Sequence, residues 1–218
     1  MLDRDTLKSG AFLTSFREAP GIEWWTEERI EASMHETLAR RPQSEPVWLF
    51  AYGSLICNPL FEFEESHLAT LDGWHRSFCI RLVLARGSIE KPGRMLALEP
   101  GGSTEGLALR LREEDLEHEL RMVWMREMVG GVYRPEWSVV KLADGRTAQS
   151  IIFAANPDNA LYEQDASPDA VAPVIAAAHG SLGSNRDYVL HLHESLRRHG
   201  IVDAYIRELA TRLEHGRR

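Results

Sequence analysis

The sequence predicts an α+β protein with a small, curled sheet that is largely antiparallel or mixed. Strand-like segments gather in the middle of the chain, whereas the last third is helical. The regular alternation of strands and helices that a parallel βαβ sheet needs is absent from this pattern. The length of 218 residues fits one domain, or one domain with a terminal extension.

The first 46 residues are expected to form an N-terminal helical extension to a main domain of residues 47–218. Thr26 is a good helix cap, and the two glutamates that follow it favour the positive end of the helix dipole. Prolines in residues 40–46 then disfavour helix and predict a linker. A narrow apolar stripe at a spacing of four suggests that this helix packs on the main body: Ile30, Met34 and Leu38.

The main domain begins with a continuous apolar run, Val47–Tyr52, which predicts a buried strand that ends at Gly53-Ser54. Short strand-like pieces follow, separated by glycines and prolines, and a turn is expected at 101–106. Their ranges are Ser77–Leu84, Arg94–Leu98 and Gly106–Leu111.

A helix from about Glu113 to Met128 comes next, and then a hairpin signal. Trp137–Leu142 and Thr147–Ala154 flank Asp144-Gly145, a pair that suits a type I′ turn. The chain ends in helices. Ser167-Pro168-Asp169 supplies a cap, a proline at the first helical position and an acid in the first turn. Apolar stripes then continue on both sides of a break at His199-Gly200: Tyr188, Leu192, Leu196, Ile206, Leu209 and Leu213.

Glu127 is the first candidate for chemistry. Leu116, Leu120, Val123 and Trp124 define one apolar helix face, and Glu127 falls on that same face. Burial would raise its pKa toward the range of a general acid/base. The alternative is a glutamate at a frayed helix end, or one paired with a nearby arginine such as Arg126 or Arg134.

The Tyr52-Gly53-Ser54-Leu55 turn is the second candidate, because a glycine there lets backbone N–H groups approach an anion closely. Gly-Ser turns are common, so turn chemistry by itself also fits an ordinary connection. Cys57 is near enough to be a thiol nucleophile, although a single cysteine in an apolar stretch is more often simply packed. The sequence contains no nucleophile elbow and no metal-binding motif, and His191 and His193 point to different helix faces.

Composition restricts the partners of this chain. A net charge of −8 argues against nucleic-acid binding, which needs a basic footprint. No apolar run approaches the roughly 20 residues that a membrane helix needs, so no membrane partner is expected. The first 12 residues do not have the pattern of a signal peptide, and two cysteines suit a reducing cytosol. We therefore expect a cytoplasmic protein.

Several blocks in order resemble the ChaC-like γ-glutamylcyclotransferases. They span about Val47 to Leu209, and together they are far more specific than any one of them. The blocks are Phe50-Ala51-Tyr52-Gly53-Ser54-Leu55, Pro92-Gly93-Arg94, Arg126-Glu127 before Gly130-Gly131-Val132-Tyr133, Leu182–Tyr188 and Leu196–Gly200.

The resemblance implies a small mixed β-barrel flanked by helices, and cleavage of glutathione into 5-oxoproline and cysteinylglycine without metal or cofactor. It assigns the acid/base to Glu127. The substrate-binding residues that it implies are Phe50, Ala51, Tyr52, Gly53, Ser54, Leu55 and Tyr133. Two features depart from the family pattern: Cys57 replaces a tryptophan, and Tyr133 is six residues after Glu127 where many relatives have four.

Two other functions stay open at this point. The chain could act on other γ-glutamyl amines or peptides, or it could be a non-catalytic regulatory module of cation transport. Arg81, Arg94 and Arg134 are candidates for a carboxylate clamp, because a guanidinium suits that role, although each also fits an ordinary ion pair.

Overall fold

The computed structural model describes residues 4–5, 22–42 and 46–215 of the chain. The predicted absence of a signal peptide concerns residues that lie mostly outside this part, and so does the middle of the predicted linker. The named elements are α3 (Glu27–Ala39), β1 (Trp48–Ala51), α4 (Ser54–Cys57), β2 (Glu65–Leu82), β3 (Gly93–Arg110), α5 (Leu116–Glu127), β4 (Tyr133–Leu142), β5 (Thr147–Ala155), α6 (Pro168–Ala177), β6 (His179–Gly180), β7 (Gly183–Ser184), α7 (Asn185–Arg198) and α8 (Ala204–His215).

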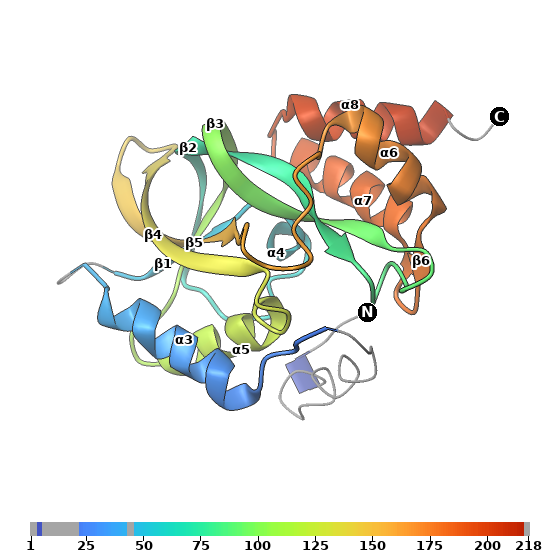
Figure 1. Ribbon diagram of the computed structural model, residues 1–218. Helices are drawn as coiled ribbons and strands as arrows, with labels where there is room; N and C mark the ends of the chain where they lie inside the picture. Colours follow the sequence, from blue (N-terminus) through green and yellow to red (C-terminus); the bar gives the residue numbers. More distant parts are fainter. Residues whose placement is uncertain (1–3, 6–21, 43–45, 216–218) are drawn as a thin grey trace.

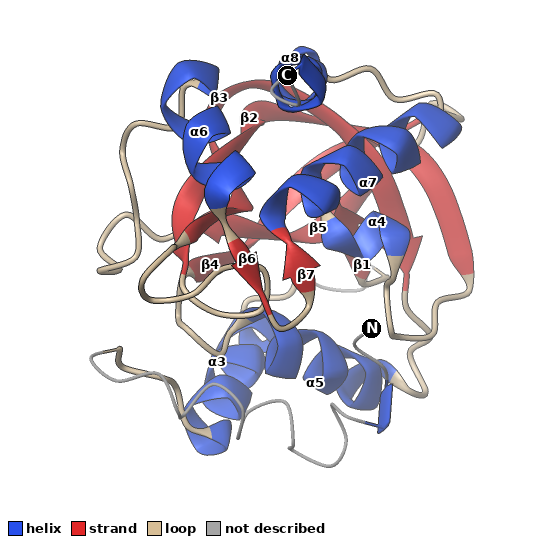
Figure 2. Cartoon of the chain, turned by 90° about the vertical axis from the view of Figure 1, so that its right-hand side faces the viewer, coloured by secondary structure: helices blue, strands red, loops and turns tan. Residues whose placement is uncertain are grey.

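Five strands form a closed barrel in the order β1-β3-β2-β4-β5 (Figure 1). Neighbours in that order pair antiparallel, and the barrel closes where β1 lies parallel to β5. Helices α6, α7 and α8 pack together on one side, while α3 and α5 lie side by side at another (Figure 2). The α+β class and the small mixed barrel flanked by helices are therefore confirmed.

The central strands are longer than the sequence suggests. The pieces Arg94–Leu98 and Gly106–Leu111 belong to one strand, β3, which pairs with β2 along most of its length. The turn expected at 101–106 is wrong, because Gly101 and Gly102 lie inside this strand with φ of 110° and 72°. A register shift between Asp72 and Trp74 absorbs the irregularity as a bulge, which strengthens the strand twist that barrel closure needs.

The β4–β5 hairpin is confirmed, but its predicted turn type is wrong. Gly145 has φ of 89°, whereas Asp144 is not among the described residues with positive φ, so the turn is not type I′. The N–H of Gly145 donates to the carbonyl of Leu142 at 3.0 Å, and Lys141 pairs with Thr147. This loop is a tight turn followed by one left-handed glycine, the second common way to join two strands.

The helix signals agree with the structure. The hydroxyls of Thr26 and Ser167 cap α3 and α6. Helix α5 begins at Leu116, three residues after the expected start, and ends at Glu127. In the described part of the chain, no helix is long and apolar enough to span a membrane.

The helix of the extension packs on α5 and β4. Arg121 of α5 forms ion pairs with Glu27 and Glu31, and the indole N–H of Trp137 donates to the carbonyl of Thr37 at 2.8 Å. The N–H of Trp25 donates to Val129 at 2.8 Å, directly behind the end of α5. The described part of the extension therefore supports the region that follows Glu127.

Candidate active site

Glu127 is the last residue of α5, and its side chain is buried apart from 12% of its surface. Its Oε1 is buried without a hydrogen-bond partner and lies 3.1 Å from Nε of Arg126. Burial raises the pKa of this carboxyl, and the charge of Arg126 offsets only part of that effect. The carboxylate therefore combines two of the arrangements considered from the sequence, because it faces inward and also contacts Arg126.

A second glutamate of the same helix shows what a structural buried carboxylate looks like here. Glu119 is 4% exposed and accepts two hydrogen bonds from Arg4, at 2.9 and 3.0 Å, and a third from the N–H of Glu62 at 2.7 Å. Burial alone would raise its pKa, but these bonds outweigh burial and lower it. Glu127 has no comparable set of donors, so its inward position is not explained by structural pairing alone.

The turn after β1 lies next to α7. Gly53 precedes α4, and a Cβ atom on it would be 3.2 Å from Cδ2 of Leu96 and 3.6 Å from the hydroxyl of Tyr188. The first N–H groups of a helix have no acceptor within the helix, so those of Ser54 and Leu55 are not used by α4 itself. This turn therefore offers backbone donors beside an aromatic hydroxyl.

The position of the turn is fixed by a buried arginine. Arg76 is 2% exposed, and its Nε donates to the carbonyl of Tyr52 at 2.7 Å. Its other nitrogens donate to the carbonyl of Glu105 at 2.6 Å and to Asp203 at 2.8 Å. The end of β1 is thereby tied to β3 and to the start of α8.

Three tyrosines share the electrostatic environment of the Glu127 carboxylate: Tyr52 and Tyr133, which are buried, and Tyr188, which is partly buried. Burial raises the pKa of Tyr52, Tyr133 and Tyr188, and the negative charge of Glu127 raises each of them further. The phenols therefore remain protonated donors at neutral pH. The hydroxyl of Tyr52 donates to the carbonyl of Phe153 at 2.7 Å, and that of Tyr133 to Leu96 at 2.9 Å.

Tyr133 reaches this region because Gly130 and Gly131 form a tight turn after α5. Gly131 has φ of 58°, and its N–H donates to the carbonyl of Met128. This turn lies between Glu127 and Tyr133. The structure places Tyr133 at the start of β4, where Glu127 influences its pKa.

The remaining residues of the predicted set lie in the core. Phe50 and Ala51 are fully buried in β1, and Leu55 is 6% exposed in α4. The ring of Phe50 packs against Gly106, where a Cβ atom would be 2.7 Å from it. These three side chains therefore pack in the core next to the turn.

Tyr188 was missed as a site residue in the sequence. It belongs to the apolar stripe of α7, and an aromatic residue in such a stripe is normally read as core. Tyr188 lies near the start of α7, whereas Glu127 ends α5, so local spacing in the sequence could not show that the two belong to one region. Within the described hydrogen bonds, its hydroxyl has no partner.

The three arginines considered for a carboxylate clamp lie in different surroundings. Arg134 forms an exposed ion pair with Asp158, and Arg81 is exposed on β2. Arg94 lies 3.7 Å from Glu163, and its Nη1 is buried without a hydrogen-bond partner among the described residues. A clamp formed by any of them stays a prediction.

The cysteines and the metal-binding residue types do not suggest other chemistry. Burial raises the pKa of the Cys79 thiol to about 12, so it is not a thiolate at neutral pH, and Cys57 is exposed. Among the residues that the structure describes, no group of three or more histidine, cysteine, aspartate or glutamate side chains could hold a metal.

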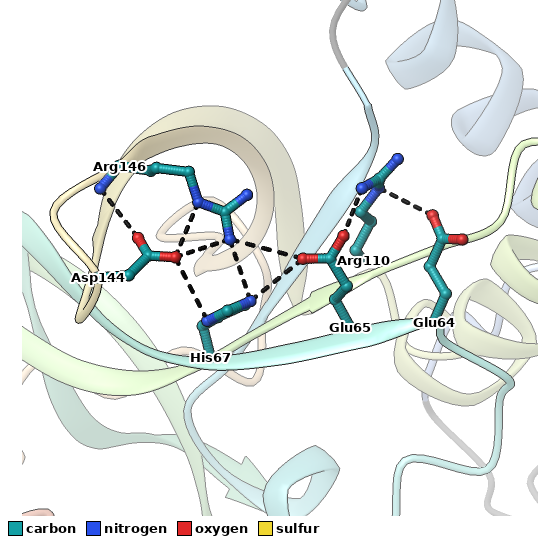
Figure 3. A network of polar contacts seen from close by, with 6 residues as sticks. All are labelled: Glu64, Glu65, His67, Arg110, Asp144 and Arg146. Carbon is teal, nitrogen blue, oxygen red and sulfur yellow. Dashed lines mark hydrogen bonds and ion pairs between the residues drawn. The ribbon is translucent and has the colours of Figure 1, made fainter.

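A dense polar network joins Glu64, Glu65, His67, Arg110, Asp144 and Arg146 (Figure 3). His67 contacts Glu65 at 3.2 Å, and Arg146 reaches both Asp144 and His67. Hydrogen bonds from His67 and Arg110 lower the pKa of Glu65. Their side chains are 28–52% exposed, so the network fits a surface ion cluster of small energetic value.

A separate cavity of about 550 Å³ opens between β2, β3 and α8. Arg76, Glu99, Asp203 and Tyr205 are part of its lining. All the hydrogen-bonding nitrogens of Arg76 are engaged in the contacts described above, so this cavity does not present a free charged group from it. Glu127 is not part of the cavity lining.

Comparison with known proteins places these features in a family context. A family model described as ChaC-like protein matches residues 47–215. The chain is 46% identical to the glutathione-specific γ-glutamylcyclotransferase of Escherichia coli over 209 residues, which cover 96% of this chain and 90% of that protein. It is 32% identical to glutathione-specific γ-glutamylcyclotransferase 1 of Danio rerio over 69% of this chain and 79% of the relative.

A solved structure supports the fold independently. The crystal structure of a yeast γ-glutamyl cyclotransferase specific to glutathione matches with a TM-score of 0.72 at 20% identity. The match covers 79% of this chain and 97% of the yeast chain.

Proposed function

Since the chain belongs to the ChaC-like protein family, we propose that it is a γ-glutamylcyclotransferase that cleaves glutathione into 5-oxoproline and cysteinylglycine. One observation carries the proposal: the carboxylate of Glu127, whose buried Oε1 has no hydrogen-bond partner, shares its surroundings with three protonated tyrosines, and one of these, Tyr188, approaches the Gly53 turn. We place this chemistry in residues 47–218, with residues 1–46 as an extension.

The substrate supplies its own nucleophile. Its α-amine attacks its own γ-carbonyl, a C–N bond closes the five-membered lactam, and the bond to the cysteinyl nitrogen breaks. The protein has to fold the γ-glutamyl chain into this geometry, and such positioning accounts for much of the rate. A protein nucleophile has no part in the reaction.

Glu127 carries the proton in this proposal. Its raised pKa lets the carboxylate take protons from the substrate ammonium and pass them to the leaving cysteinyl nitrogen. The ammonium loses two protons as it becomes the lactam N–H, and the cysteinyl nitrogen gains two as it leaves as an ammonium, so the proton balance closes. The charge of Arg126, 3.1 Å away, favours the ionised carboxylate and opposes part of the rise in pKa that burial causes.

The turn and the tyrosines hold the substrate. Backbone donors at Gly53, Ser54 and Leu55 suit either the α-carboxylate or the oxyanion that develops on the γ-carbonyl. Tyr188 faces the same turn, with its hydroxyl unengaged among the described hydrogen bonds. Tyr52 and Tyr133 donate to backbone carbonyls, which fixes their rings and leaves their oxygens as acceptors.

The test is to incubate the purified protein with glutathione, γ-glutamylcysteine or γ-glutamylalanine and to detect 5-oxoproline by mass spectrometry. We expect product from glutathione, and loss of product in Glu127→Gln. Glu117→Gln is the matched control, because it removes an exposed carboxylate from the same helix.

The other possible results would change the substrate, the function or the role of Glu127. Product from the other substrates instead of glutathione would keep the mechanism and change the substrate. A folded wild-type protein that releases no 5-oxoproline from any of them would favour a non-catalytic regulatory module. Full activity in a folded Glu127→Gln variant would remove Glu127 from the proton transfer.

A further inference from the structure

The loop between β2 and β3 is held firmly against the β6–β7 hairpin. The N–H of Leu182 donates to the carbonyl of Ala85 at 2.7 Å, and Nη1 of Arg86 donates to the carbonyl of Ser184 at 3.1 Å. A Cβ atom on Gly180 would lie 2.4 Å from the Ala85 carbonyl oxygen, so the two backbones are in close contact. The base of the Arg86 side chain is therefore fixed.

The guanidinium of Arg86 reaches toward the proposed site. Its central carbon lies 5.7 Å from the ring centre of Tyr188, within the range of a cation–π contact. The hydroxyl end of the same ring approaches Gly53. The charges of Arg86, Arg126 and Glu127 all influence the pKa of Tyr188, so these groups share one electrostatic environment.

The two arginines in this environment differ in their partners. Arg126 contacts Glu127 and donates to the carbonyl of Asn58 at 2.5 Å. Arg86 forms no ion pair with any residue in the described part of the chain, and its described side-chain hydrogen bond goes to one carbonyl. A guanidinium has five N–H donors in a fork that matches a carboxylate, so most of its donors are available.

We propose that Arg86 binds the glycine carboxylate of glutathione and thereby selects the tripeptide over shorter γ-glutamyl compounds. This inference rests on the proposed function. Two extended residues, the length of the cysteinylglycine half, span about 7 Å. The Tyr188 ring bridges the interval that this half would cross, because its hydroxyl lies 3.6 Å from the position of a Cβ atom on Gly53 and its ring centre lies 5.7 Å from the guanidinium carbon of Arg86. γ-Glutamylcysteine ends one residue earlier and leaves Arg86 without a partner.

The experiment compares KM and kcat for glutathione, for its glycine monoethyl ester and for γ-glutamylcysteine. In the wild-type protein, we expect the ester to have a KM about ten- to a hundredfold above that of glutathione, because a charge-assisted contact is lost. This comparison needs no variant. Equal KM values for acid and ester would overturn the proposal.

The variants extend this comparison. Arg86→Gln should raise the KM for glutathione by the same factor, leave kcat within about twofold and leave the ester unchanged. Arg86→Lys should recover part of the loss, since it restores the charge without the fork. Arg198→Gln removes an exposed charge at the far end of α7 and should change the KM of neither glutathione nor its ester.

The failure of this inference differs from the failure of the proposed function. If Arg86→Gln raises the KM for glutathione and for its ester by the same factor, or lowers kcat alone, Arg86 does not bind the carboxylate although the enzyme is active. If the wild-type protein forms no 5-oxoproline from any of the three compounds, the proposed function itself is rejected, and this inference with it.

Discussion

Replacing Glu127 by glutamine should stabilise the fold by the same change that stops turnover. The Glu127 side chain is 12% exposed, and its Oε1 has no hydrogen-bond donor. The contact with Arg126 at 3.1 Å offsets only part of the cost of burial, because the pKa is still raised. Glutamine has nearly the shape of the neutral acid and cannot ionise, so it avoids this cost.

The gain should depend on pH with a definite sign. The reference pKa of a glutamate is 4.5, and that of Glu127 in the fold is higher. Below pH 4.5 both folded and unfolded chains hold the proton, and the acid and the amide are equivalent. Between 4.5 and the folded pKa only the folded chain holds it, so wild-type stability falls by up to about 1.4 kcal/mol for each pH unit. Above the folded pKa neither chain holds the proton, and the difference in stability between wild type and Glu127→Gln no longer changes with pH.

The size of the effect follows from the charge, because glutamine leaves the same buried oxygen unpaired and removes only the ionisation. Each pH unit between 4.5 and the folded pKa contributes up to about 1.4 kcal/mol. We therefore expect Glu127→Gln to raise the free energy of unfolding by about 1 kcal/mol or more at pH 8 and to leave it unchanged near pH 4. Urea denaturation of both proteins at the two pH values measures this difference.

The exposed Glu117→Gln variant is the control and should differ little from wild type at either pH. Two results would refute the reasoning. A Glu127→Gln protein that is no more stable than wild type at pH 8 would show that the carboxylate is adequately paired. A gain of the same size at both pH values would show that the effect does not come from ionisation.

Three further predictions concern activity and the supporting turns. The acid limb of the kcat profile should have its midpoint above pH 4.5, because Glu127 must ionise through its raised pKa before it accepts a proton; rates measured from pH 4 to 8 locate it. Gly53→Val should raise KM about tenfold or more while the circular dichroism spectrum is retained, since a bulkier side chain displaces the substrate from the turn; an unchanged KM would contradict this. Gly131→Ala should cost more in thermal stability than Gly145→Ala, because both have positive φ but only the first would place a Cβ atom 2.4 Å from Trp25; equal losses would mean that this contact contributes nothing.

Local signals in the sequence predicted what depends on neighbours in the chain. The Ser167-Pro168 pair marked the start of α6, because a cap and a proline act within one helical turn. The apolar face of α5 was correct for the same reason, since its period is set by helix geometry alone. Glu127 was found through that period, and its burial follows the predicted face.

Features set by pairing between distant strands were not predictable in this way. The continuity of β3 through Gly101 and Gly102 depends on β2, whose hydrogen bonds hold the strand together where its own composition favours a turn. Closure of the barrel by parallel pairing of β1 and β5 likewise leaves no trace in either strand. The partly buried pair of Arg4 and Glu119 joins residues 115 apart in the sequence and has no local signature.

The candidate site combines both kinds of information, which explains why its sequence prediction was incomplete. A carboxylate on an apolar face is conspicuous because burial of a charge is costly, so Glu127 could be singled out. A tyrosine on an apolar face is not conspicuous, because its ring packs well whether or not its hydroxyl has a task. Tyr188 and Arg86 therefore became visible only when the fold brought α7 and the β2–β3 loop to the Gly53 turn. In such a site the proposed acid/base can be inferred from sequence periodicity, whereas the residues proposed to select the substrate require the three-dimensional arrangement.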